Sequence, residues 1–347
     1  MRVSRWMLVG GTAAIVAAVA ITGSLGVSKA PAAEKAPFRA ALISDVGGFN
    51  DNGFNKNQLV GMKRAIADLG GQYFALLSHT FSDYDPNYHT AVEVDKANIV
   101  IAAGFLLGGT MKTWAHDHPG TRFAITDQPA TAVGGYKNEM GITYATPQAG
   151  CLVGVLAAKK AQQMGHKVIG AVGGIPIPPV YTWIAGYKFC AQKAVPGTQV
   201  VVQYSNDFVN QAACATLAQN EIQIQHAQVV FQVAGLCGDG ALKKAAQLGK
   251  WGVGVDADEY NVAPGHILTS ALKKTDVGVY KVIHNAFNAW KGGTNIKLDL
   301  KNGGVGVGRI SPAVPAAWIT LMKSYKQKIV TQALIPPGKC SPHPDCT

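Results

Sequence analysis

Short apolar runs alternate with longer amphipathic segments through most of the chain, and this alternation limits the folds that the chain can adopt. Strands are predicted at residues 38–43, 73–77, 99–103, 122–126, 167–172, 199–203, 229–233 and 252–255. Helices are predicted between them, at residues 59–69, 85–96, 111–116, 148–163, 181–194, 212–223 and 241–248. Strands that are apolar on both faces are typical of parallel sheets covered by helices on both sides. The 347 residues are enough for two such α/β units of roughly 150 residues each.

A polar loop at residues 44–55 joins the first predicted strand to the first predicted helix. Open α/β sheets bind ligands at such loops, because the carboxyl ends of parallel strands leave a crevice there. The loop contains amides, carboxylates and an aromatic ring, at Asp45, Asn50, Asp51, Asn52, Phe54 and Asn55. An ordinary turn is the alternative interpretation, because Gly, Asn and Asp favour turns for backbone reasons alone.

The loop sequence DVGGFNDNGFN at residues 45–55 resembles the opening signature of the basic membrane protein family. Members of this family are substrate-binding proteins of ABC transporters, and they include proteins similar to the purine nucleoside receptor of spirochaetes. Further similar segments follow in the family's order, at residues 99–107, 123–127, 168–176, 252–258, 268–276 and 301–305. The resemblance thus extends over nearly the whole chain that follows the N-terminal apolar run.

The resemblance implies a fold that the pattern alone does not specify, namely the type I periplasmic-binding-protein fold. This α/β fold has two doubly wound lobes joined by three crossing segments, which we expect at residues 141–146, 268–274 and 301–310. The implied boundaries are 1–33 for an export signal, 38–143 plus 270–304 for the first lobe, 144–269 plus 305–335 for the second lobe and 336–347 for a C-terminal tail. Two further helices are expected, at residues 277–290 on the first lobe and 316–332 on the second.

Polar residues at the ends of the predicted strands would face each other across the cleft of such a fold. A hydroxyl-rich ligand needs carboxylate acceptors, and aromatic faces hold a flat ring. By resemblance, Phe54 and Phe208 match the phenylalanines that stack on a purine, although core packing is the alternative for both. Also by resemblance, Asp45, Asn55 and Asp127 match positions near the base, and Asp256 and Lys273 match a pair that contacts ribose.

The second-lobe wall is where this sequence departs from the family pattern. Gly235-Leu236-Cys237-Gly238 replaces a more glycine-rich loop, and Val209-Asn210 follow Phe208 where the family favours Asn-Asp. We still include Gly235 among the expected ligand-binding residues. Of the adjacent Lys273 and Lys274, backbone alternation lets only one face the cleft, and we expect it to be Lys273.

Catalytic and metal-binding interpretations have less support in the sequence. Asp45 and Asp51 could form an acid–base pair, but two carboxylates in a turn are more often helix caps. The glycine-rich residues 303–308 are not followed by a helix that could bind a phosphate. His116 and His118 lack an evident third ligand. We therefore expect a protein that is not an enzyme and that has no cofactor or metal site.

The charge and the N-terminus bear on partners and localisation. The net charge is +11, but Lys and Arg are scattered, so no nucleic-acid partner is expected. Arg2 and Arg5 precede an apolar run, which predicts an export signal cleaved near Ala30–Ala33, with an uncleaved anchor as the alternative. No cysteine precedes Cys151, so the lipid anchor of many family members is not predicted. We expect a periplasmic or otherwise exported monomer of the cell envelope.

The chain contains six cysteines, at positions 151, 190, 214, 237, 340 and 346, and this number in an exported chain indicates disulfides. Cys190 and Cys214 both fall on predicted helices of the second lobe, and they are the first pair to test. Cys340 and Cys346 could close a small loop. With His343 between them they also resemble a metal clip, which is the lesser option.

These observations together lead to a functional hypothesis. The chain would capture a nucleoside, with a purine favoured, by hinge closure of two lobes, and would deliver it to an ABC permease in the membrane. The alternatives are a binder of another flat or polyhydroxylated ligand, such as a free purine base or a sugar, and a ligand sensor that docks on a membrane receptor. A nucleoside hydrolase is a further alternative.

Overall fold

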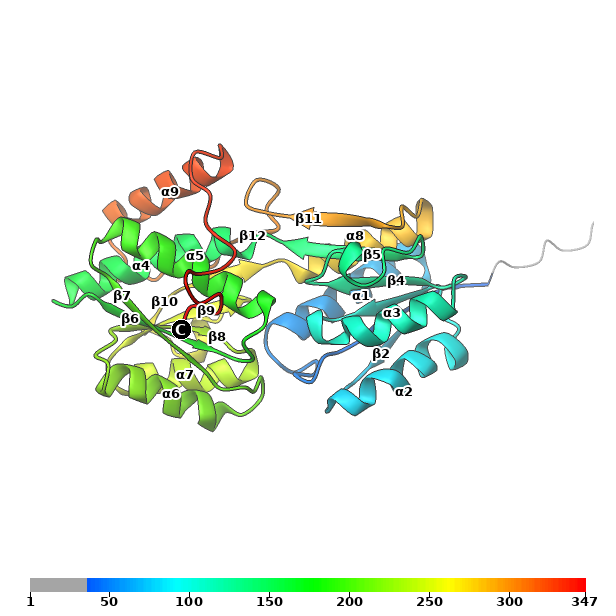
Figure 1. Cartoon of the computed structure of the whole chain (residues 1–347), viewed down its shortest axis with the longest axis horizontal. Helices are drawn as coiled ribbons and strands as arrows, with labels where there is room; N and C mark the ends of the chain where they lie inside the picture. Colours follow the sequence, from blue (N-terminus) through cyan, green and yellow to red (C-terminus); the bar gives the residue numbers. More distant parts are fainter. Residues whose placement is uncertain (1–35) are drawn as a thin grey trace, which may run out of the picture. The chain divides into compact units, whose positions relative to one another are not determined.

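The computed structural model describes residues 36–347, and residues 37–347 form one compact unit that contains two six-stranded sheets (Figure 1). The predicted export signal lies outside the described residues. The first lobe contains β1 (Phe38–Ile43), α1 (Phe54–Leu69), β2 (Gly71–Leu76), α2 (Tyr84–His89), β3 (Ile99–Ala102), α3 (Gly108–Asp117), β4 (Arg122–Thr126), β5 (Glu139–Tyr144), α8 (Thr275–Asn288) and β11 (Thr294–Leu298). The second contains α4 (Thr146–Gln163), β6 (Val168–Gly173), α5 (Pro178–Ala194), β7 (Gln199–Tyr204), α6 (Gln211–Gln223), β8 (Val229–Val233), α7 (Leu236–Gln247), β9 (Trp251–Asp256), β10 (Ile267–Lys273), β12 (Val305–Val307) and α9 (Ala316–Val330).

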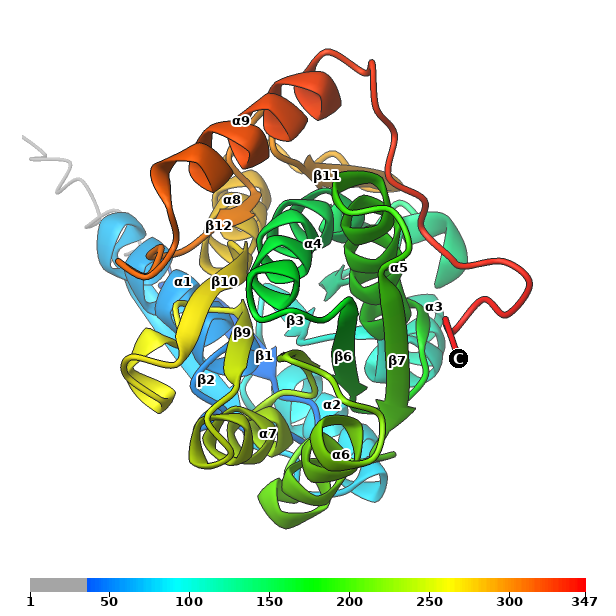
Figure 2. The same ribbon diagram turned by 90° about the vertical axis from the view of Figure 1, so that its left-hand side faces the viewer.

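In the two sheets, all neighbouring strands run parallel except at one edge of the second sheet. The strand order in the first sheet is β11-β5-β4-β3-β1-β2, and every neighbouring pair is parallel. The order in the second sheet is β12-β10-β9-β8-β6-β7, in which only the short edge strand β12 runs antiparallel to its neighbour. Figure 2 shows α4 and α5 on one side of the second sheet and α6 and α7 on the other. The predicted pair of doubly wound α/β lobes is therefore confirmed.

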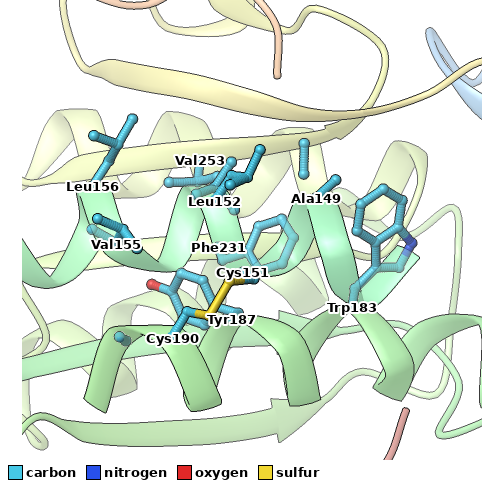
Figure 3. Close-up of a cluster of buried hydrophobic side chains, with 14 of the residues drawn as sticks. Ala149, Cys151, Leu152, Val155, Leu156, Trp183, Tyr187, Cys190, Phe231 and Val253 are labelled. Carbon is cyan, nitrogen blue, oxygen red and sulfur yellow. A yellow bond between two sulfur atoms is a disulfide. The ribbon is translucent and has the colours of Figure 1, made fainter. Parts of the chain in front are cut away.

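The continuous apolar runs arise because helices cover both faces of each sheet. In β1, Leu42 packs on one side with Met62 of α1, while Ile43 packs on the other side with Tyr88 of α2. Successive side chains of a strand point to opposite faces, so both faces need apolar residues when both are covered. In the second lobe, α4 and α5 pack together against Phe231 of β8 (Figure 3).

Three short connections join the lobes, and they are hydrogen-bonded to one another. They run from β5 to α4 through Ala145, from β10 to α8 through Lys274, and from β11 to β12 through residues 299–304. The amide of Ala145 donates to the carbonyl of Leu298 (2.8 Å), and the amide of Lys274 donates to the carbonyl of Gly304 (2.9 Å). The connections therefore lie side by side.

Several expected element boundaries differ from the structure. Residues 141–144 and 268–273, expected as crossing segments, belong to strands β5 and β10, and the chain crosses only after each strand ends. Strand β11 was not predicted. Helices α1 and α7 begin earlier than expected, at Phe54 and Leu236. In α1, the carboxylate of Asp51 accepts hydrogen bonds from the amides of Gly53, Asn55 and Lys56, which satisfies the free donors of the first turn.

The disulfide pairing Cys190–Cys214 was wrong. The structure pairs Cys151 with Cys190, Cys214 with Cys237, and Cys340 with Cys346. Cys190 lies on α5 and Cys214 on α6, and these helices pack on opposite faces of the second sheet, so the sheet separates the two thiols. Cys340 and Cys346 close a loop in the tail, as the first of the two options predicted.

Candidate ligand-binding site

A cavity lies between the lobes, where the carboxyl ends of the strands of both sheets meet. About 600 Å³ of space in and at the mouth of this cavity, open solvent included, is not filled by protein atoms. All eight residues expected to bind a ligand line this one cavity: Asp45, Phe54, Asn55, Asp127, Phe208, Gly235, Asp256 and Lys273.

The loop after β1 is organised around Asn55, whose amide group is engaged by the protein itself. Its Nδ2 donates to Asp45 Oδ1 (2.7 Å) and to Asp51 Oδ2 (2.9 Å), and its Oδ1 accepts from the amide of Asp45 (3.1 Å). Asp45 Oδ1 also accepts from the amide of Gly47 (2.8 Å). Asn55 therefore holds the Asp45 carboxylate in place at the cavity wall, rather than presenting a free amide to a ligand.

Phe54 lies on the first turn of α1, not in the predicted loop, and its ring packs against the backbone of Gly104. A Cβ at Gly104 would lie 3.0 Å from Cε1 of Phe54, and the φ angle of Gly104 is 120°, which favours glycine. The ammonium of Lys273 lies 4.6 Å from the centroid of the Phe54 ring. The ring edge thus contacts the backbone of Gly104, and the Lys273 ammonium lies near the ring.

Lys273 ends β10 in the second lobe and pairs with Asp127, which follows β4 in the first lobe. The Nζ–Oδ2 distance is 2.5 Å, and the two side chains are 2% and 7% exposed. The Lys273 ammonium also lies 5.2 Å from the ring centroid of Tyr144. Lys274 is exposed, so Lys273 is the one that faces the cleft, as expected.

Asp127 and Asp256 occupy equivalent places in the two lobes, directly after β4 and at the end of β9. Both have left-handed backbones, with φ angles of 71° and 60°, and residues other than glycine seldom adopt this conformation. Such strained conformations cluster at binding sites. Asp256 Oδ1 is buried without a hydrogen-bond partner among the described residues. This oxygen is therefore an acceptor available to a ligand.

Enclosure of the cavity changes the protonation of its carboxyl groups. Burial raises the pKa of Asp45 to about 7, against the hydrogen bonds from Asn55 and Gly47. Burial also raises the pKa of Asp256 to about 7, although Lys273 opposes the shift. The pKa of Asp127 is raised by burial as well, and its pairing with Lys273 limits the rise. The site thus carries less negative charge than its four lining carboxyl groups suggest.

The second lobe contributes a largely apolar wall that the sequence analysis predicted only in part. Phe208 and Gly235 belong to it, together with residues that were not predicted: Ile177, Pro179, Val180, Trp183, Val233, Leu236 and Val255. From the first lobe, Phe105 and Leu106 add apolar surface. Trp183 is the largest of the missed residues. The sequence could have indicated Trp183, because it lies in the first turns of the helix that follows β6, just as Phe54 lies in the first turn of the helix that follows β1.

The arrangement suits binding of a flat, neutral molecule with hydroxyl groups. Aromatic and aliphatic side chains form the walls, while carboxylates and Lys273 provide a small number of polar contacts. Among residues 36–347, no group of three or more His, Cys, Asp or Glu side chains is arranged to hold a metal ion. In the same range, no helix has both the length and the hydrophobicity needed to cross a membrane.

Solved structures share this fold. A solute-binding protein of an ABC transporter system from Aeropyrum pernix K1 superposes with a TM-score of 0.78 at 24% identity, covering 87% of this chain and 94% of the other. An ABC transporter solute-binding protein from Agrobacterium vitis, bound with α-D-tagatopyranose, superposes with a TM-score of 0.63 at 19% identity, covering 82% and 98%.

Sequence relatives agree with the fold. An uncharacterized lipoprotein of Pyrococcus furiosus is 28% identical over 93% of this chain and 87% of its own length. The ABC transporter nucleoside-binding protein BmpA of Lactococcus lactis subsp. cremoris is 28% identical over 79% of this chain and 82% of its own. The model of the Bmp family, described as ABC transporter substrate-binding protein PnrA-like, matches residues 38–339. The chain therefore belongs to the Bmp family of PnrA-like substrate-binding proteins of ABC transporters.

Proposed function

We propose that the cavity binds a nucleoside, with a purine base favoured, and that the protein hands this ligand to an ABC permease. The observation that carries the proposal is the placement of Phe54 and Phe208 from opposite lobes in one cavity that Asp256 also lines. Asp256 Oδ1 is buried there without a hydrogen-bond partner in residues 36–347. Aromatic rings stack on a base, and a buried carboxylate oxygen accepts a hydrogen bond from a ribose hydroxyl. The name of the Lactococcus relative, a nucleoside-binding protein, supports the same ligand class.

Ligand capture would proceed by closure of the lobes about the three connections. Two interlobe contacts would form on closure: the Lys273–Asp127 pair, and a hydrogen bond from Asn52 Nδ2 to Asp239 Oδ2 (3.3 Å). A ligand that bridges both lobes adds its own contacts and so shifts the population toward the closed form. The closed form would be the one that the permease recognises, on the outer side of the membrane after export. Binding and closure require no catalytic residue.

A thermal-shift panel tests the ligand class. The chain lacking residues 1–33 would be unfolded and refolded to remove copurified ligand, and then mixed with adenosine, guanosine, inosine, uridine, cytidine, free purine bases, ribose and other sugars. A ligand at ~100 times its Kd stabilises the folded state by about 2.7 kcal/mol, which moves the Tm by several degrees. We expect purine nucleosides to give the largest shifts. No shift with any nucleoside, together with a shift from another class, would refute the proposal.

A polyhydroxylated ligand is the second candidate, favoured by the number of carboxyl groups in the cavity. Asp45, Asp127 and Asp256 all line it, and sugar-binding sites need many acceptors. The same panel separates the two candidates, because a sugar would shift the Tm where a free base does not. Release of free base and ribose from a nucleoside during incubation would indicate a hydrolase instead.

A further inference from the structure

The six cysteines of the described residues form three disulfides, and all of them lie in the second lobe or in the tail that packs on it. Two of them have different relations to the cavity. Cys151–Cys190 joins α4 to α5 within the core between these helices (Figure 3). Cys214–Cys237 joins the first turns of α6 and α7, with a Cα–Cα distance of 5.5 Å.

The loops that precede α6 and α7 both contribute to the cavity wall. Phe208 lies in the loop between β7 and α6, and Gly235 lies between β8 and α7. The Cys214–Cys237 bond therefore links the helix starts that directly follow two wall segments.

The Phe208 loop is attached to α7 at the position of this disulfide. The amide of Cys237 donates to the carbonyl of Phe208 (3.0 Å), and Cys237 Sγ lies 2.9 Å from the carbonyl oxygen of Asn210. The left-handed Gly235 permits this approach, because a Cβ there would lie 3.3 Å from the Phe208 carbonyl oxygen. Cys237 is thus a point at which the Phe208 loop contacts α7.

The start of the loop is held by the chain after β6, because the amides of Ser205 and Asn206 donate to the carbonyls of Gly173 (2.9 Å) and Gly174 (3.0 Å), and the Phe208 ring packs against Gly174. The part of the loop that follows Phe208 has fewer restraints. Val209 and Asn210 are exposed, and the carboxylate of Asp207 bonds only the amides of these two residues within the loop. Cys214 and Cys237, in contrast, are fully buried in the small apolar cluster beneath α6 and α7. The covalent bond anchors an exposed loop to a buried cluster.

We propose that the Cys214–Cys237 disulfide positions the Phe208 side of the ligand site, so that affinity for a flat ligand depends on this bond. The inference rests on the proposed function, because it assigns the bond a role in stacking by Phe208. Without the bond, only side-chain packing holds the starts of α6 and α7 together, and the Phe208 ring loses part of the support that fixes its place in the wall. The other core disulfide, Cys151–Cys190, joins α5 about two helical turns beyond the wall residue Trp183 and links no loop of the wall.

The test compares two double variants of the refolded chain, C214A/C237A and the matched control C151A/C190A. Both lose one disulfide that closes a loop of comparable length, with sequence separations of 23 and 39 residues, so both lose comparable stability. Kd would be measured by calorimetry well below each Tm, with whichever of adenosine, guanosine and inosine shifts the wild type most. We expect C214A/C237A to weaken binding at least about fivefold, within the range that base–aromatic stacking contributes. The control should stay within about twofold of wild type, since its bond lies about two helical turns beyond Trp183, the nearest wall residue of α5.

A double-mutant cycle with F208A shows whether the effect passes through the ring. In the F208A background, loss of the Cys214–Cys237 bond should change Kd by less than about twofold, because the stacking contact is already absent. An undiminished effect there, or equal binding by wild type and C214A/C237A, overturns the inference. If C214A/C237A does not fold, the more volume-conserving C214V/C237A replaces it. Failure of the wild type to bind any nucleoside overturns the proposed function, and the inference with it.

Discussion

Replacement of Lys273 by Met should lower the free energy of unfolding by about 3–5 kcal/mol, the usual cost of removing one partner from a buried ion pair. Lys273 and Asp127 are 2% and 7% exposed, and their charged atoms lie 2.5 Å apart. Met fills a similar volume, so the main change is that Asp127 keeps its buried place without a cation. Loss of the cation should also raise the pKa of Asp127 further, since Lys273 is what lowers it.

A double-mutant cycle separates the loss of the ion pair from a simple loss of packing. Urea unfolding of K273M, D127N and the double variant should show single-variant losses that are far from additive, with the double variant close to wild type. The loss in K273M should also grow as pH rises, because an unpaired buried carboxylate is tolerated only when protonated. Additive losses, or a K273M loss below about 1 kcal/mol at neutral pH, would show that the pair is not buried as described.

Three further predictions concern the cavity. The ligand-free protein should become less stable as pH rises from about 4 to 7, and its stability should then level off. Burial raises the pKa values of Asp45 and Asp256 from 3.8 to about 7, so in this pH range the folded state holds protons that the unfolded state has released. Urea titrations at several pH values should show a flatter dependence of stability on pH in D45N than in wild type, and equal slopes would contradict the raised pKa of Asp45. F54A should weaken nucleoside binding, measured by calorimetry, by about 1–3 kcal/mol through loss of stacking. Binding of wild-type affinity in F54A would show that Phe54 does not contact the ligand. G104A should also weaken binding, since its Cβ would lie 3.0 Å from the Phe54 ring at a φ angle of 120°, and a wild-type Kd with unchanged Tm would show that the ring is free to move.

The parts of the fold that were predictable are those whose residues are dictated by burial. Strands β1, β3, β4 and β8 are buried on both faces over most of their length, and each could be recognised as a mainly apolar run. Strand β11 was missed because it lies at a sheet edge, where Thr294 and Lys297 are exposed and the sequence TNIKL carries little apolar signal. Its partner β5 exists as a central strand only because β11 covers it.

The site was predictable where strand ends and a family signature coincide. Asp45, Asp127 and Asp256 follow strands, so their shared location came from topology. The role of Asn55 was not predictable, because its bonds to Asp45 and Asp51 depend on where α1 begins. That start is fixed by Asp51, which caps the helix from outside its first turn. The disulfide partners were unpredictable for a similar reason, since pairing depends on which face of the sheet each helix covers.

The order of the strands in the first sheet has a consequence for biosynthesis. Its edge strand β11 ends at Leu298, and helix α8, which covers α1, ends at Asn288, so both are synthesised after strands β6 to β10 of the second lobe. A nascent chain that stops before residue 294 therefore leaves β5 as an unpaired edge and α1 uncovered. The N-terminal half of the protein cannot finish folding ahead of the C-terminal half on the ribosome, as N-terminal domains commonly do. Both lobes reach their native state only when the chain is nearly complete.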